Sequence, residues 1–463
     1  MKKSILVLSI LISFSVSGIF AQTDTINFSD YKLPDLKRQS LDFVYNFDNY
    51  YNNTNYSDTL TENNVNKLFQ INSNFKASYS LYKNTRKYQG RQYGNINNKN
   101  YFLKNTFTPD SISEISGNKS ASFSNSIILN SFNKFYFKEK YFFGANLNIG
   151  TNLYKYSYKK NDTLQNINKS NLITVSPELS IGKGRIEPVT DYVHSIYIIK
   201  NLEKENRLTE KISNEQLIRL TKLISEIKNK RFFDSRIKTI YELEKVDSFL
   251  QAEHLISEKD ARYFTTLNDN WEYAGNQYRN HGYYMKFYIL PRLTINNISY
   301  KNLNDTNTNT RKIILGETGI TLNSYKNINL YWQRYFSVKL ATSINKTLSY
   351  SDSTNFNETG KKIFALANLG YSWYPNTRTN FIFSVNTGYG PTLYNEIIPD
   401  IQTNKDNTFF INLYLTSYYY VSPRFRITVN CNSNYNYYSR SIDSFTQNKI
   451  NFYFSAGIQY SLF

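Results

Sequence analysis

Two glycines, Gly182 and Gly184, stand where the periodicity of the sequence changes and where phosphate chemistry could be expected. Before them apolar and polar residues alternate up to Ile181, as in a strand, and after them apolar residues recur at helical spacing. A dinucleotide-binding loop needs a third glycine at the helix start, and Glu187 occupies that position. The sequence therefore favours a backbone hinge at Gly182 and Gly184, with a second at Gly282 where the chain returns.

Histidine chemistry is the next possibility. His194, His254 and His281 lie in or beside one segment, residues 184–281, and none falls on an alternating segment. This argues against a hydrolase whose histidine-assisted catalysis takes place at the ends of such segments. His194 and His254 also lack the close spacing of a metal-binding helix. The sequence predicts no enzyme activity, catalytic residue, cofactor or metal site.

Basic residues form the remaining candidate site. The alternation places five of them on the polar face of their strands, with Glu178 as the acidic counterpart: Lys286, Arg292, Lys339, Arg424 and Arg426. Basic groups around a water-filled pore favour anions. Two interpretations stay open, because these residues could line an anion-preferring pore or pair with carboxylates of the loops or of residues 184–281 and hold a plug in place.

The assignment of these basic side chains to one face requires strands in which apolar and polar residues strictly alternate. The clearest runs for thirteen residues from Ile450 to Leu462, more than the ~9–11 that a tilted strand needs to cross a bilayer. The pattern predicts fourteen strands, with twelve or sixteen as alternatives, centred near Phe43, Phe75, Phe102, Ile128, Leu147, Val175, Phe287, Leu315, Leu340, Ala367, Phe383, Leu413, Val429 and Phe454. An even number suits an antiparallel β-barrel with both ends on one side of the membrane.

Residues 184–281 have a different character. They carry three or four apolar stripes at helical spacing, and Ser213 with Gln216 forms a capping box before one of them. Between Pro188 and Arg279 there are fifteen basic and fifteen acidic residues, so this segment is neutral. We expect a helical insertion that starts near Pro188. Counting strands places both of its ends at the periplasmic rim, where it would hang in the periplasm or plug the lumen.

The start of the chain and its charge indicate the compartment. Lys2, Lys3 and the apolar run that follows predict a signal peptide over residues 1–21, cleaved near Ala21. The net charge of +19 is dispersed, with no basic block for a nucleic acid backbone. The predicted parts are therefore the signal peptide, an N-terminal barrel part (22–183), the helical insertion (184–281) and a C-terminal barrel part (282–463).

Together, the signal peptide, the amphipathic strands, the alternation of short and long joins and the aromatic C-terminus at Phe463 resemble a porin-like outer-membrane β-barrel protein of a Gram-negative bacterium. The resemblance implies contact with outer-membrane lipid, insertion by the barrel assembly machinery, and passive or gated diffusion of small solutes. The alternative is a non-channel barrel that anchors the helical module or surface loops, which would bind envelope partners or glycans.

Overall fold

The computed structural model describes residues 28, 31–58, 61–108, 116–230, 235–275, 277–302, 305–351, 355–396, 404–422, 425–440 and 445–460. The predicted signal peptide lies outside the described residues, and so does Arg424. No described helix is both long and apolar enough to span a membrane.

Strands make up most of the described chain. In sequence order they are β1 (Leu36–Asp58), β2 (Thr61–Asn84), β3 (Tyr88–Thr108), β4 (Ser116–Phe137), β5 (Tyr141–Lys160), β6 (Thr163–Pro188), β7 (Asn280–Asn302), β8 (Thr306–Asn327), β9 (Trp332–Ser351), β10 (Asn355–Trp373), β11 (Thr379–Glu396), β12 (Asn404–Ser422), β13 (Phe425–Arg440) and β14 (Thr446–Tyr460). Each contains one of the predicted strand centres.

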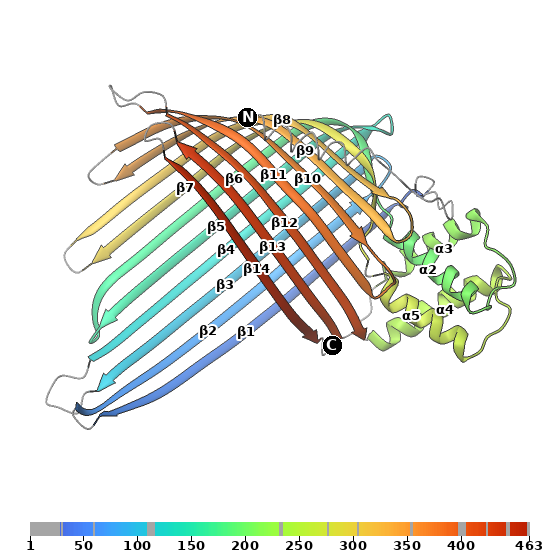
Figure 1. Ribbon diagram of the computed structural model, residues 1–463, viewed down its shortest axis with the longest axis horizontal. Coiled ribbons are helices and arrows are strands. Elements are labelled where there is room, and N and C mark those ends of the chain that lie inside the picture. The colour runs from blue at the N-terminus through green and yellow to red at the C-terminus, as the bar shows by residue number, and fades with distance from the viewer. Residues whose placement is uncertain are drawn as a thin grey trace.

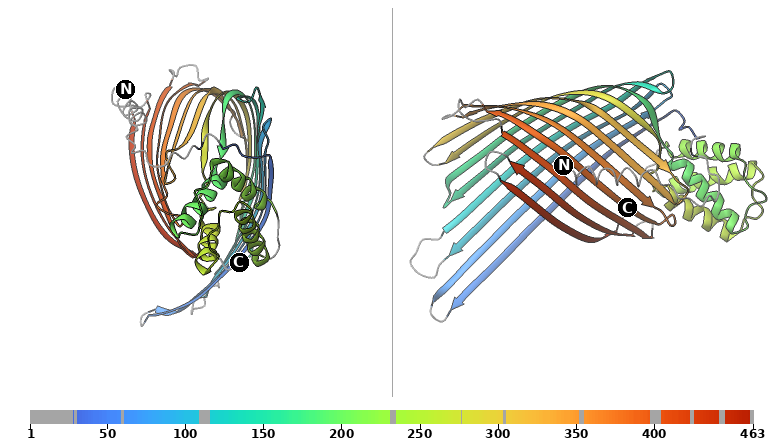
Figure 2. Two further views of the ribbon diagram at one scale, coloured as in Figure 1. Left: turned by 90° about the vertical axis from the view of Figure 1, so that its right-hand side faces the viewer. Right: turned by 45° about the horizontal axis from the view of Figure 1, so that its top comes forward.

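All fourteen strands form one antiparallel sheet in sequence order, from β1 to β14. The sheet curls into a barrel-shaped wall, with four helices gathered at one end (Figures 1 and 2). The predicted fold class, an antiparallel β-barrel of about fourteen strands with a helical insertion, is confirmed. The insertion follows the sixth strand.

The wall has an apolar outer face. On β7 the side chains of Tyr283, Met285, Phe287 and Ile289 are exposed, whereas Tyr288 on the opposite face is only 2% exposed. The same alternation leaves large apolar side chains exposed on most of the other strands. Successive side chains of a strand point to opposite faces, so a period of two in the sequence becomes one apolar and one polar surface.

β1 and β14 are the two ends of the strand order. Neighbouring residues Phe43 and Val44 of β1 are both exposed, and so are Phe452 and Tyr453 of β14. Because adjacent residues of a strand face opposite sides, each of these strands is exposed on both faces. Within the described part of the chain no ladder joins β1 to β14.

The helices lie beyond one rim of the wall. They are α2 (Thr190–Lys204), α3 (Asn214–Ile227), α4 (Ser235–Ala252) and α5 (Ala261–Ala274). The predicted capping box is present, since Ser213 Oγ accepts from the backbone of Gln216 and the side chain of Gln216 accepts from the backbone of Ser213. Their apolar stripes meet in a common core that includes Ile198, Leu220 and Leu250. We call this unit the helical cap.

The joint between the sixth strand and the cap differs from the prediction. β6 does not end at Ile181: it pairs with β7 as far as Pro188 opposite Asn280, and α2 begins at Thr190. Gly184 and Gly282 have positive φ angles of 102° and 110°, which other residues rarely adopt. The two glycines thus supply an unusual backbone conformation within the paired strands without breaking the ladder. Helical structure occupies less than the whole of residues 184–281.

Candidate functional site

The helical cap is fixed to the rim through Arg279, which follows the last helix and is fully buried. Its guanidinium donates to the carbonyl of Leu330 at 2.8 Å and to Asn327 Oδ1 at 3.3 Å. It also lies over the ring of Tyr374, 3.5 Å from the centroid. Leu330 belongs to the join between β8 and β9, and Tyr374 to the join between β10 and β11, so one side chain ties the cap to two turns.

A second set of contacts links α5 to the β10–β11 turn. Arg378 forms an ion pair with Asp269, and its guanidinium lies 4.3 Å from the ring centroid of Tyr273. Gln277 Nε2 donates to the carbonyl of Asn376 at 2.7 Å. The ring of Tyr273 also contacts Tyr420 at the end of β12, with 6.1 Å between the centroids.

The opposite side of the cap is held by Asp191, near the start of α2. Its carboxylate, 4% exposed, accepts from Arg38 of β1 at 2.9 Å, from Lys228 at 3.0 Å and from Ser225 at 2.7 Å. Burial alone would raise the pKa of Asp191, but Lys228 and Arg38 outweigh it and hold the pKa well below its usual range. Asp191 is therefore ionised and joins β1, α2 and α3.

The residues before β1 extend this attachment. Phe28, Tyr31 and Leu33 are buried against α2, in a cluster that also contains Val193. The carbonyl of Leu33 accepts from Arg86, in the turn between β2 and β3. The cap and these residues thus contact the rim at β1, at the β2–β3, β8–β9 and β10–β11 turns, and at β12. Seen from that end, the helices lie across part of the mouth (Figure 2).

Three of the predicted pore residues meet in one cluster on the inner face. Lys339 Nζ lies 2.7 Å from Glu317 Oε1, and Lys286 pairs with Glu178. The hydroxyl of Tyr288 donates to Glu317 at 2.7 Å, and both lysine ammonium groups lie within 5.3 Å of its ring centroid. We call this group, with Arg292, the lumen charge cluster.

Arg292 completes the cluster through Ser176, whose Oγ accepts from its Nε at 2.9 Å. Residues 176–178 of β6 have no partner in the β6–β7 ladder. Pro177 has no backbone N–H to donate to a neighbouring strand, so an interruption of the ladder is expected there. The cluster thus holds three cations and two carboxylates. The two carboxylates come from strands, and not from loops or from the insertion as the second interpretation of the sequence expects.

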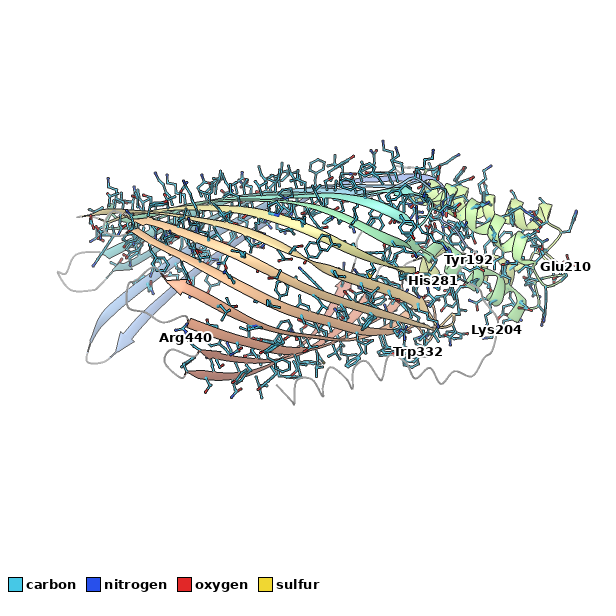
Figure 3. The ribbon with its side chains drawn as sticks, turned by 90° about the horizontal axis from the view of Figure 1, so that it is seen from above. Tyr192, Lys204, Glu210, His281, Trp332 and Arg440 are labelled. Atoms are coloured by element: carbon cyan, nitrogen blue, oxygen red, sulfur yellow. The ribbon has the colours of Figure 1, made fainter. Side chains whose placement is uncertain are left out.

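The other predicted residues lie elsewhere. Arg426 of β13 donates to Gln459 at 2.5 Å and contacts Tyr418 and Tyr420, near the cap and away from the cluster. Gly182 packs closely, since a Cβ there would lie 2.4 Å from the ring of Phe142. Figure 3 shows the length of the wall, with His281 and Trp332 near the helical end and Arg440 near the other.

The histidines do not form a site together. The sequence predicts none of them on a strand, but His281 is the second residue of β7, because the ladder with β6 extends beyond the alternating segment. His194 is buried in the helical cap against Trp271, with 4.9 Å between the ring centroids. Burial lowers its pKa well below the ordinary value near 6.5, and Lys228 adds to the effect. Among the described residues no group of three or more His, Cys, Asp or Glu side chains could hold a metal ion.

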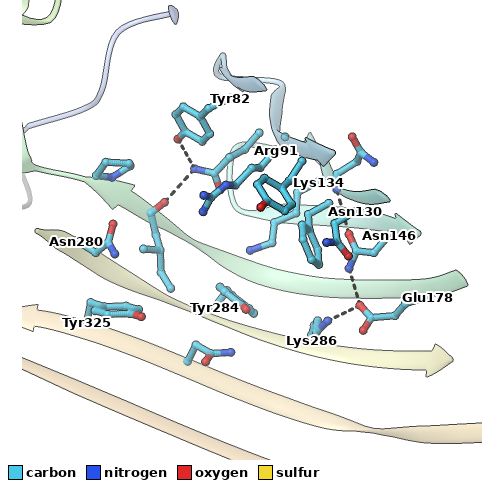
Figure 4. A pocket seen from close by; sticks show the side chains of 18 of the residues that line it. Tyr82, Arg91, Asn130, Lys134, Asn146, Glu178, Asn280, Tyr284, Lys286 and Tyr325 are labelled. Carbon is cyan, nitrogen blue, oxygen red and sulfur yellow. Dashed lines mark hydrogen bonds and ion pairs between the residues drawn. The ribbon is translucent and has the colours of Figure 1, made fainter. Parts of the chain in front are cut away.

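A cavity of about 670 Å³ opens inside the wall between the lumen charge cluster and the cap (Figure 4). Its lining includes Tyr82, Arg91, Lys134 and Tyr284 from the strands, Pro188 at the end of β6, and Tyr278 from the connection between α5 and β7. Glu178 and Lys286 belong to both the cavity and the cluster.

Sequence reasoning missed several side chains of the candidate site. Glu317 lies on the same face as the predicted basic residues, and the alternation of β8 could have revealed it. Arg91 and Lys134 lie on strands whose pattern is weaker. Arg279 and Asp191 carried no recognisable signal, because their partners come from turns and strand ends distant in the sequence.

Comparisons with known proteins add little to this geometry. No family model matches the sequence, and no curated protein is significantly similar to it. Among solved structures, the translocator domain of the autotransporter NalP from Neisseria meningitidis is 8% identical, with 82% of this chain and 90% of that chain covered and a TM-score of 0.27. The ferric yersiniabactin uptake receptor FyuA from Yersinia pestis is 7% identical, with 89% and 63% covered and a TM-score of 0.31. Likenesses of this size identify neither a family nor an activity.

Proposed function

We propose that the protein is an outer-membrane channel for small solutes and that the helical cap restricts passage at its periplasmic mouth. The observation that carries the proposal is the attachment of the cap to separated points of one rim, through Arg279, Arg378 and Asp191. Arg279 lies in one of the two connections to the wall, whereas the contacts of Arg378 and Asp191 are additional to both connections and would be absent from a module that was only tethered.

The inner and outer surfaces support a place in a membrane. The outer face carries exposed apolar side chains, as contact with lipid requires. The inner face carries the lumen charge cluster and a cavity with polar walls, as passage of hydrated solutes requires. The cap lies at one rim of the wall, which we assign to the periplasm, the side from which the barrel assembly machinery would insert the chain.

The cluster also supports a modest preference for anions. Lys286 and Lys339 are each matched by a carboxylate, and Arg292 bonds to a neutral serine hydroxyl. The three cations against two carboxylates leave one positive charge in excess. We therefore expect a weaker anion preference than five free basic residues would give.

Planar-bilayer recordings test the proposal. The Arg378→Ala variant removes the ion pair to Asp269 and should raise the open probability relative to the unmodified protein. Arg219→Ala is the matched control, because it removes an ion pair of 2.8 Å to Glu253 that lies wholly within the cap. A protein that gives no channels in any of the three forms would overturn the proposal.

A second candidate function follows from the surface of the cap. Ile240 of α4 and Phe264 of α5 are about half exposed there, and exposed apolar side chains occur at protein contacts. In this alternative the wall is an anchor and the cap binds an envelope partner. The recordings separate the two, since an anchor gives no current whatever the state of the cap.

A further inference from the structure

We propose that the cavity between the lumen charge cluster and the cap binds a small anionic saccharide, such as a sugar acid. The inference rests on the proposed function only for the route by which the solute reaches the lumen. The cavity itself is defined by side chains of β2 to β8 and by Tyr278 of the connection between α5 and β7. Its volume of about 670 Å³ falls within the roughly 300–1,000 Å³ of small-molecule sites.

Two cations give the cavity its charge. Arg91 and Lys134 both line it, and the described residues offer neither of them a carboxylate partner in an ion pair. Glu178, the one acidic residue of the lining, already accepts from Lys286 and from Asn146. Arg91 and Lys134 reach into the same space (Figure 4). An anionic group in that space would meet two basic side chains that form no ion pair with a described carboxylate.

Lys134 is held in place by aromatic rings. Its ammonium lies 3.4 Å from the ring centroid of Tyr284 and 5.0 Å from that of Phe142. These contacts stabilise the cation without consuming its hydrogen-bond donors. The group is therefore fixed in position and still able to donate to a carboxylate.

The rest of the lining suits hydroxyl groups and sugar rings. Amide side chains can both donate to and accept from a hydroxyl. Asn133 and Asn146 of the lining already bond within the wall, whereas the amide nitrogens of Asn130, Asn280 and Asn323 donate to no described residue. Tyrosine rings offer flat apolar faces with a polar edge, and those of the lining are Tyr82, Tyr93, Tyr278, Tyr284 and Tyr325. A simple inorganic anion would use few of these groups, whereas a sugar acid would use all three kinds.

Calorimetric titration of the full protein in detergent tests the inference with three probes: galacturonate, galactose and acetate. We expect galacturonate to bind and the other two to bind at least about tenfold more weakly, because each lacks one part of the complementary surface. Equal binding of galactose would overturn the role of charge. Equal binding of acetate would overturn the saccharide assignment, and undetectable binding of galacturonate would overturn the whole inference.

Variants locate the site. Arg91→Gln and Lys134→Gln should each weaken galacturonate binding about tenfold or more, and two variants guard against a folding defect in one of them. Lys312→Gln, on β8 outside the cavity, is the charge-matched control and should bind as the unmodified protein does. Unchanged binding in both cavity variants would overturn the inference. Titration requires no current, so its failure and the failure of the channel proposal are separate results.

Discussion

At the scale of single residues, charge pairing decides what the lumen can do. The sequence places Lys286, Arg292 and Lys339 on one face correctly, because a strand has a side-chain period of two. The sequence does not reveal that Glu178 pairs with Lys286 and Glu317 with Lys339. Such pairing depends on the register between neighbouring strands. The lumen charge cluster is therefore nearly balanced, whereas the sequence alone leaves open whether the basic residues are free or paired.

Removing one carboxylate should shift this balance. In Glu317→Gln the cluster loses a negative charge opposite Lys339, so we expect a stronger preference for anions. The reversal potential of a planar bilayer under a salt gradient measures it. Glu215→Gln, on the exposed start of α3, is the control and should leave the potential unchanged. An unchanged potential in Glu317→Gln would show that the cluster does not face the conducting path.

His194 should make the stability of the cap depend on pH. Burial depresses its pKa in the folded state, so below about pH 6.5 the unfolded chain binds a proton that the folded one does not. The contribution of neutral His194 to the free energy of unfolding is complete above about pH 6.5. It is lost as the pH falls toward the pKa of the folded state, by up to about 1.4 kcal/mol per pH unit. Asp191, with its lowered pKa, stays ionised over this range.

Urea unfolding of the cap, followed by helical circular dichroism at pH 7.5 and 5.5, measures this effect. The unmodified protein should unfold at a lower urea concentration at pH 5.5. His194→Phe keeps an aromatic ring against Trp271 and cannot titrate, so its midpoint should move much less. Equal shifts in the two proteins would assign the pH dependence to other groups.

At the scale of elements, periodicity predicts the strands and helices well and their ends poorly. All fourteen strand centres and the capping box at Ser213 follow from local pattern. The extension of β6 to Pro188 does not, because it depends on pairing with β7, which is distant in the sequence. The attachment of the cap through Arg279 is hidden for the same reason: its partners are turns that close other strand pairs.

The bend at the joint should need glycine. An alanine at Gly184 would have an unfavourable φ of +102° and a Cβ 2.3 Å from the carbonyl oxygen of Tyr283. We expect Gly184→Ala to lower the free energy of unfolding by roughly 1–3 kcal/mol. Gly150→Ala is the control, since a Cβ there meets nothing within 4 Å. Equal unfolding midpoints for the two variants would contradict the strained geometry.

At the scale of the whole molecule, the edges of the wall need partners. In a bilayer the outer backbone groups of β1 and β14 cannot bond to water, so we expect the two strands to pair with each other there. Hydrogen exchange in lipid nanodiscs tests this. Amides of β1 and β14 should exchange about as slowly as those of β7 and β8, and rapid exchange confined to the two edge strands would mean that the wall stays open.

The central claim concerns the cap and the mouth as one assembly. Gln277, in the connection that follows α5 of the cap, bonds to the carbonyl of Asn376 in the β10–β11 turn, which brings the two residues close enough for a short chemical tether. The background would carry Cys431→Ser, which removes the single native cysteine.

The most direct measurement is single-channel current through Gln277→Cys with Asn376→Cys, joined by a thiol cross-linker that a reducing agent cleaves. We predict that the tethered protein conducts rarely and that cleavage during the recording raises its open probability, with no such change in the Cys431→Ser parent. Equal currents before and after cleavage would contradict a cap that restricts passage.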